Sequence, residues 1–131
     1  MIVRNLSAAV FLFVSAGAAG AQSLPKCDGT YATIRTSSIL PGKMPLFEKA
    51  VADQAAWYAA HPNGSAAHLV RVLHTDPKTH AVAYSDDEAM TLTTHNKPGE
   101  PERDGAWAAF VAEFKASSKV KDEHRVCLPR M

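Results

Sequence analysis

The first pattern along the chain is an alternating segment from Tyr31 to Ser38, which reads Tyr-Ala-Thr-Ile-Arg-Thr-Ser-Ser. Such alternation is typical of a strand, in which successive side chains point to opposite faces of a sheet. The segment lies between Cys27 and the first helix-like run. We interpret it as a central strand on which the rest of the domain is arranged.

Two longer stretches have the apolar spacing of three and four residues that amphipathic helices show. The first runs from about Pro45 to Ala60 and is followed by His-Pro-Asn-Gly, which ends a helix because proline cannot continue it and glycine readily takes the left-handed conformation. The second follows Asp104, a residue type that caps helix N-termini. The two predicted stripes consist of Phe47, Val51, Gln54 and Tyr58, with Leu46, Ala50 and Trp57 beside them, and of Trp107, Phe110, Val111 and Phe114.

Three further segments have the alternation or the β-branched content of strands: His68–His74, Ala89–His95 and His124–Leu128. Between the first two of them, His80–Ser85 is either an extension of the core strand 89–95 or its hairpin partner, and Asp86–Glu88 has the composition of a turn. Two prolines, a glycine and mixed charges predict a loop over Asn96–Arg103.

The predicted order is strand, helix, strand, strand, helix, strand, which is the split βαβ arrangement of ferredoxin-like α+β domains. Its four-stranded antiparallel sheet is covered on one face by two helices. The first and last strands are antiparallel neighbours in this fold, so the start of one lies beside the end of the other. Cys27 and Cys127 fall at these positions, and we expect them to form a disulfide.

The amino-terminal residues have the pattern of a secretory signal peptide. Residues 1–21 contain one positive charge, at Arg4, an apolar run from Ala8 to Val14 and a small-residue end, Ala-Gly-Ala. The apolar run is too short and too rich in Ala and Gly for a membrane anchor. We expect a single domain over residues 22–131 and a periplasmic or secreted location, in which cysteines are oxidised.

The charge balance argues against two classes of partner. The chain has 14 Lys and Arg against 13 Asp and Glu, and removal of Arg4 leaves 13 of each. No basic field remains that would hold nucleic acid or an anionic membrane surface. We therefore expect neither as a partner.

The chain resembles the dimeric α/β-barrel superfamily, which includes antibiotic-biosynthesis monooxygenase-like, NIPSNAP-like and stress-responsive barrel domains. The resemblance rests on the element order, on the Ile-Arg-Thr-Ser strand that leads through Pro-Gly-Lys to a helix with Phe47, on the helix from Trp107 to Phe114, and on the Val-Cys-Leu-Pro end. It implies a homodimer with a small-molecule cavity and no particular reaction, because members of the superfamily differ widely in chemistry.

The strands also predict two different sheet faces. We expect the two helices to cover the apolar face, which consists of Ile34, Val70, Val72, Met90, Leu92, Val126 and Leu128. The opposite face carries Tyr31, Thr33, Arg35, Leu69, Arg71, Leu73, Thr91, Thr93, His95 and Arg125. Its mixture of leucine, threonine and cations suits a partly enclosed polar cavity, and a solvated outer face is the alternative interpretation.

If that face is a cavity, Arg35 and Arg71 hold a carboxylate, enolate or phenolate, and His95 acts as a general acid or base. Tyr31, Thr91 and Thr93 then orient the ligand. No Asp or Glu falls at an inward position of the predicted strands, so the arginines need an anionic ligand, water or a partner subunit to compensate their charge. The six histidines show no HxH, HExxH or HxxxH spacing, and we expect neither a metal nor another cofactor.

Two functions remain open from the sequence. The first is an exported, cofactor-independent enzyme of the monooxygenase, cyclase or lyase type that acts on a small anionic or phenolic compound. The second is a non-catalytic periplasmic ligand-binding or stress-related dimer.

Overall fold

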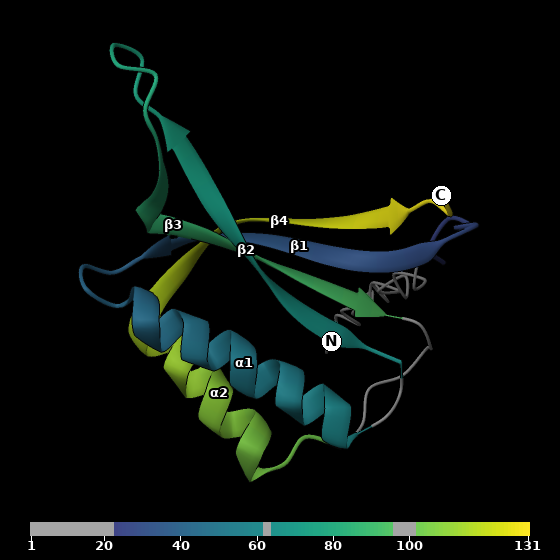
Figure 1. The fold of residues 1–131 in the computed structure, drawn as a ribbon. Helices are drawn as coiled ribbons and strands as arrows, with labels where there is room; N and C mark the ends of the chain where they lie inside the picture. The colour runs from purple at the N-terminus through teal and green to yellow at the C-terminus, as the bar shows by residue number, and fades with distance from the viewer. Residues whose placement is uncertain (1–22, 62–63, 96–101) are drawn as a thin grey trace, which may run out of the picture.

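The computed structural model describes residues 23–61, 64–95 and 102–131. The chain folds in the predicted order, with six elements that lie as Figure 1 shows: β1 (Thr30–Ile39), α1 (Met44–Ala60), β2 (Ala66–Thr75), β3 (Val82–His95), α2 (Gly105–Ser117) and β4 (Ser118–Leu128). The predicted signal peptide over residues 1–21 lies outside the described residues, as does most of the predicted 96–103 loop. The α+β ferredoxin-like fold class is confirmed.

The four strands form one antiparallel sheet in the order β2-β3-β1-β4. β1 lies inside it, with Thr33 opposite Thr93 on β3 and opposite Arg125 on β4. This pairing confirms the predicted central strand and the adjacency of the first and last strands.

A disulfide joins Cys27, before β1, to Cys127 at the end of β4, as predicted, with 5.7 Å between their Cα atoms. The chain passes very close to β4 two residues later. A Cβ atom added to Gly29 would lie 1.7 Å from the carbonyl oxygen of Leu128, so this approach requires glycine.

Both helices pack on the same face of the sheet (Figure 1). They supply most of the large side chains of the core, including the buried rings of Phe47 and Trp57 from α1 and of Phe110 from α2. The sheet contributes Ile39 and the small residues Ala67 and Ala89 to the same clusters. The core is therefore built from aromatic helices over a sheet face of mostly small side chains.

The prediction of which sheet face the helices cover is wrong. The covered face carries Thr33, Ser37, Thr91 and Thr93, each at most 9% exposed, and Leu69 packs there against the Phe47 cluster. The apolar face with Ile34, Val70, Val72, Met90 and Leu92 lies on the opposite side, which no described helix covers. The physical reason is volume, because bulky rings from both helices leave room for threonine, serine and alanine beneath them.

β3 is one strand, so the predicted turn at Asp86–Glu88 is wrong and the extension of the core strand is the correct alternative. The pairing of β2 with β3 is irregular here, since Arg71 faces Ala89 whereas Leu73 faces Tyr84. The Ser85 hydroxyl accepts hydrogen bonds from the amides of Asp87 and Glu88 at 3.4 and 3.0 Å. The Ser85 side chain thereby provides the hydrogen-bond acceptor for two backbone amides of the bulge. Beyond it, the β2–β3 hairpin projects from the body of the domain (Figure 1).

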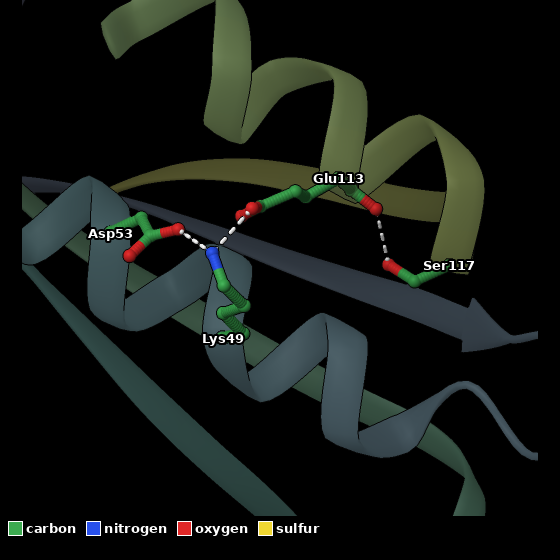
Figure 2. Close-up of polar contacts among 4 residues, drawn as sticks. All are labelled: Lys49, Asp53, Glu113 and Ser117. Carbon is green, nitrogen blue, oxygen red and sulfur yellow. Dashed lines mark hydrogen bonds and ion pairs between the residues drawn. The ribbon is translucent and has the colours of Figure 1, made fainter.

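An ion-pair network joins the two helices (Figure 2). Lys49 Nζ on α1 lies 2.5 Å from Asp53 Oδ2 and 2.6 Å from Glu113 Oε1 on α2. The hydrogen bonds to both carboxylates raise the pKa of Lys49 and lower that of Asp53. One turn further along α2, the Ser117 hydroxyl donates to the carbonyl oxygen of Glu113 at 2.8 Å. The network links α1 to α2 at the surface of the helix layer.

Candidate functional site

A cavity of about 150 Å³ lies between the covered sheet face and the two helices. β1 and β3 provide one wall, with Thr33 and Arg35 from the former and Thr93 and His95 from the latter. The helices and Arg103, two residues before α2, provide the other wall; the helix residues are Gln54, Tyr58, Trp107, Phe110, Val111 and Phe114. The site is therefore polar on the sheet side and largely aromatic on the helix side.

The sheet wall follows directly from strand register. Thr33 and Thr93 face each other across β1 and β3, and Tyr31 faces His95 one pleat further along. Thr33 Oγ1 on β1 lies 3.3 Å from His95 Nε2 on β3. This hydroxyl–imidazole contact joins diagonal neighbours of the two strands. Side chains of residues two apart share a face, so Arg35 joins the same wall.

The aromatic wall is held by Asp104, which caps α2 as predicted. Its Oδ1 atom accepts hydrogen bonds from the Trp107 amide at 3.0 Å and from Trp57 Nε1 at 2.9 Å. His61 Nε2 lies 3.3 Å from its other oxygen, and the His61 ring stacks on Trp57 with the centroids 4.2 Å apart. The hydrogen bonds from Trp107 and Trp57, followed by the charge of nearby His61, lower the pKa of Asp104.

Trp107 is thereby placed with its ring at the cavity. Its centroid lies 4.7 Å from that of Trp57 and 4.8 Å from that of Phe110, both in edge-to-face geometry. The Arg103 guanidinium carbon lies 4.7 Å from the Trp107 centroid, within the range of cation–π attraction. A cation and an aromatic face therefore meet at one end of the site.

Three of the predicted site residues, Arg35, Thr93 and His95, line this cavity together. Thr91 lies on the same sheet face and is 5% exposed, but it is not among the lining residues. Tyr31 donates its hydroxyl hydrogen bond to the carbonyl oxygen of Pro25. The role of each of these residues in binding or catalysis stays a prediction.

Arg71 lies apart from the cavity and crosslinks three elements. Its guanidinium donates to Glu48 Oε1 on α1 at 2.6 Å and to the carbonyl oxygen of Ser85 in the β3 bulge at 3.2 Å. The guanidinium carbon also lies 5.0 Å from the centroid of the Tyr84 ring. These contacts hold the base of the projecting hairpin against the helix layer.

The expectation that both arginines lack an acidic partner is wrong. Arg71 pairs with Glu48, which belongs to a helix and not to a strand. Arg35 pairs with Glu123, its direct neighbour on β4. The sequence prediction began the last strand at His124, one residue too late to include Glu123.

The helix residues of the site were missed from the sequence, because the cavity was predicted on the sheet face that points away from the helices. Gln54 carried a recognisable signal, since it is an amide within the otherwise apolar stripe of α1. Trp107 and Phe110 were assigned to the core, and they serve both the core and the cavity wall.

Within the described ranges, no group of three or more His, Cys, Asp and Glu side chains is arranged to hold a metal ion. No described helix is long and apolar enough to cross a membrane. Comparisons of the chain with family models, curated proteins and solved structures give no match.

Proposed function

We propose that the chain is an exported small-molecule-binding protein whose ligand, a small anionic or phenolic compound, occupies the cavity between sheet and helices. The observation that carries the proposal is the pairing of Arg35 and His95 on one wall with Trp107 and Phe110 on the other. A cation and hydrogen-bonding groups fix an acid or phenol, and aromatic side chains hold the apolar part of such a ligand.

The ion pair of Arg35 is compatible with this role. Its Nε atom contacts Glu123, whose side chain is 45% exposed on the edge strand β4. A guanidinium carries five N–H donors, so Arg35 can hold Glu123 and still donate to an acid in the cavity. Glu123 then orients the arginine while the ligand engages its remaining donors.

Catalysis is the further part of the proposal. His95 lies against the Thr33 hydroxyl at the cavity wall, where it can exchange a proton with a bound phenol or enol. This arrangement suits a cofactor-independent monooxygenase, cyclase or lyase reaction, and the alternative is a non-catalytic binding or stress-related protein. The enzyme predicts turnover that His95→Ala abolishes with binding retained, whereas the binding protein predicts retention of the ligand without turnover.

We also infer export and self-association. The signal-like residues 1–21 and the Cys27–Cys127 disulfide support a periplasmic or secreted location. The apolar open face of the sheet supports a homodimer, because a two-fold axis brings the same face of a second copy against it. The superfamily resemblance points to the same assembly.

The binding proposal is tested by thermal shift of the mature protein against a panel of aromatic and aliphatic acids and phenols. We expect at least one acid to raise the unfolding temperature and Arg35→Gln to remove that response. Arg71→Gln is the matched control, because it makes the same chemical change outside the cavity and should leave the ligand-induced shift intact. Absence of any response in the wild type would overturn the proposal, and equal responses in both variants would remove Arg35 from the site.

A further inference from the structure

Two of the cavity's polar side chains, Gln54 and Thr93, belong to nearly buried residues and have no hydrogen-bond partner among the described residues. Gln54 on α1 is 5% exposed and Thr93 on β3 is 4% exposed, and both line the cavity. Neither side chain makes a hydrogen bond within residues 23–61, 64–95 and 102–131. The other sheet-side polar groups of the site differ in this respect, since Thr33 contacts His95 and Arg35 contacts Glu123.

An unpaired buried amide or hydroxyl destabilises a folded protein relative to an apolar side chain of the same shape. Leucine and valine are the corresponding apolar shapes for Gln54 and Thr93, and either would suit the surrounding core. Groups of this kind are normally satisfied by ordered water or by a ligand. Their position on opposite walls of one cavity indicates a small molecule with a polar group between them.

The size of the cavity limits that molecule. A volume of about 150 Å³ equals that of an engineered protein cavity that binds benzene. One six-membered ring fits such a space, and the Trp107 and Phe110 rings offer it apolar contacts.

Strand register sets where the polar groups of the ligand lie. Thr91 stands opposite Arg35, and Thr93 is the next β3 residue on the same face. Diagonal neighbours of this kind are about 7–8 Å apart, which matches a ring with substituents at opposite ends. An acid group at Arg35 therefore places the far end of the ring near Thr93.

We propose that Gln54 and Thr93 form a hydrogen-bonding subsite for a hydroxyl group, and that the ligand is a single-ring aromatic acid with this hydroxyl opposite the acid group. The proposal rests on the proposed function and specifies the class of ligand. Thr93 and the Gln54 amide can each donate to or accept from the hydroxyl. The Arg35 guanidinium holds the carboxylate.

The test compares 4-hydroxybenzoate with benzoate by isothermal titration of the mature protein. We expect the wild type to bind 4-hydroxybenzoate about tenfold more tightly, the effect of one net hydrogen bond in a buried site. Gln54→Leu and Thr93→Val should each reduce this preference, measured as the ratio of the two Kd values within each variant. Thr91→Val is the control, because Thr91 has similar burial on the same sheet face and does not line the cavity.

The unliganded variants give a second readout. Gln54→Leu and Thr93→Val should not lower the unfolding temperature of the unliganded protein, because neither removes a hydrogen bond to another described residue. Equal affinity of the wild type for the two acids, or a preference that survives in both variants, would overturn the subsite while the binding cavity stands. Binding of neither acid would remove the single-ring acid as the ligand class. If the wider panel also gives no response, the proposed function fails with it.

Discussion

Trp57, near the end of α1, donates its indole hydrogen bond to Asp104, the N-cap residue just before α2, over 2.9 Å. The same oxygen accepts the Trp107 amide, so one carboxylate fixes the first turn of α2 and the last turns of α1. Both tryptophans belong to the aromatic cluster beside the cavity. The position of the aromatic wall thus depends on a residue outside the site.

We predict that Asp104→Ala lowers the unfolding temperature by about 5 °C, the shift that follows from loss of an N-cap in a domain of this size. Asp104→Asn should have a smaller effect, because asparagine keeps the oxygen that accepts from Trp107 and Trp57. Thermal unfolding followed by circular dichroism measures both variants. Equal unfolding temperatures for the wild type and Asp104→Ala would show that the cap contributes nothing.

The stability of the domain should fall in acid partly through Asp104. The pKa of this carboxyl lies below its ordinary value of 3.8 in the folded chain, so the unfolded chain binds the proton more readily. The stabilisation is complete above about pH 5 and is lost as the pH falls through the lowered pKa. Asp53 and Asp76 are shifted in the same direction and add to the acid sensitivity.

Urea unfolding at pH 7, 4 and 2.5 tests this contribution. We expect Asp104→Asn to be less stable than the wild type at pH 7 and the difference to shrink towards pH 2.5, as the Asp104 carboxyl takes up its proton. A difference that stays constant over this range would assign the effect of Asp104 to geometry and not to its charge.

The order of the elements could be predicted because each carries a strong local pattern, such as the alternation in β1 and the Asp104 cap before the Trp107 stripe. The boundaries of β4 could not be predicted in the same way. Its first six residues, Ser118–Glu123, are mostly charged. Taken alone, this local sequence favours a loop over a strand. β4 is an edge strand, where charged side chains are tolerated and oppose edge-to-edge association.

The site could be predicted only in part. Alternation showed that Arg35, Thr93 and His95 share a face, and the structure places all three at one cavity. Alternation does not show which face the helices cover, because that depends on the volume that helix side chains such as Phe47 and Phe110 occupy. The salt bridges of Arg35 and Arg71 depend on the extent of β4 and on the position of α1, which no local pattern contains.

The disulfide should contribute substantially to stability, because it closes a loop with a sequence separation of 100 residues. The chain-entropy model gives on the order of 4 kcal/mol for a loop of this size. The double variant Cys27→Ser/Cys127→Ser should unfold at a markedly lower denaturant concentration and retain its far-ultraviolet circular dichroism spectrum. Intact mass should rise by two hydrogens on reduction, and two free thiols in the exported protein would contradict the bond.

The final prediction concerns the open face of the sheet. Val70 on β2 is 38% exposed there and stands opposite Met90, which itself faces Thr36 on β1. Lysine at position 70 can reach water in a monomer, whereas in a face-to-face dimer it would place an unpaired charge at the interface. Val70→Lys should therefore preserve the fold and raise the dimer Kd by at least about tenfold.

Sedimentation velocity at micromolar concentration measures the effect. Val120→Lys is the matched control, because Val120 is 59% exposed on β4 and stands opposite Ser37 on the helix-covered face. We expect the wild type and Val120→Lys to sediment as dimers and Val70→Lys as a monomer. A monomeric wild type would rule out the dimer at this concentration, and a dimeric Val70→Lys would place the interface on another surface of the domain.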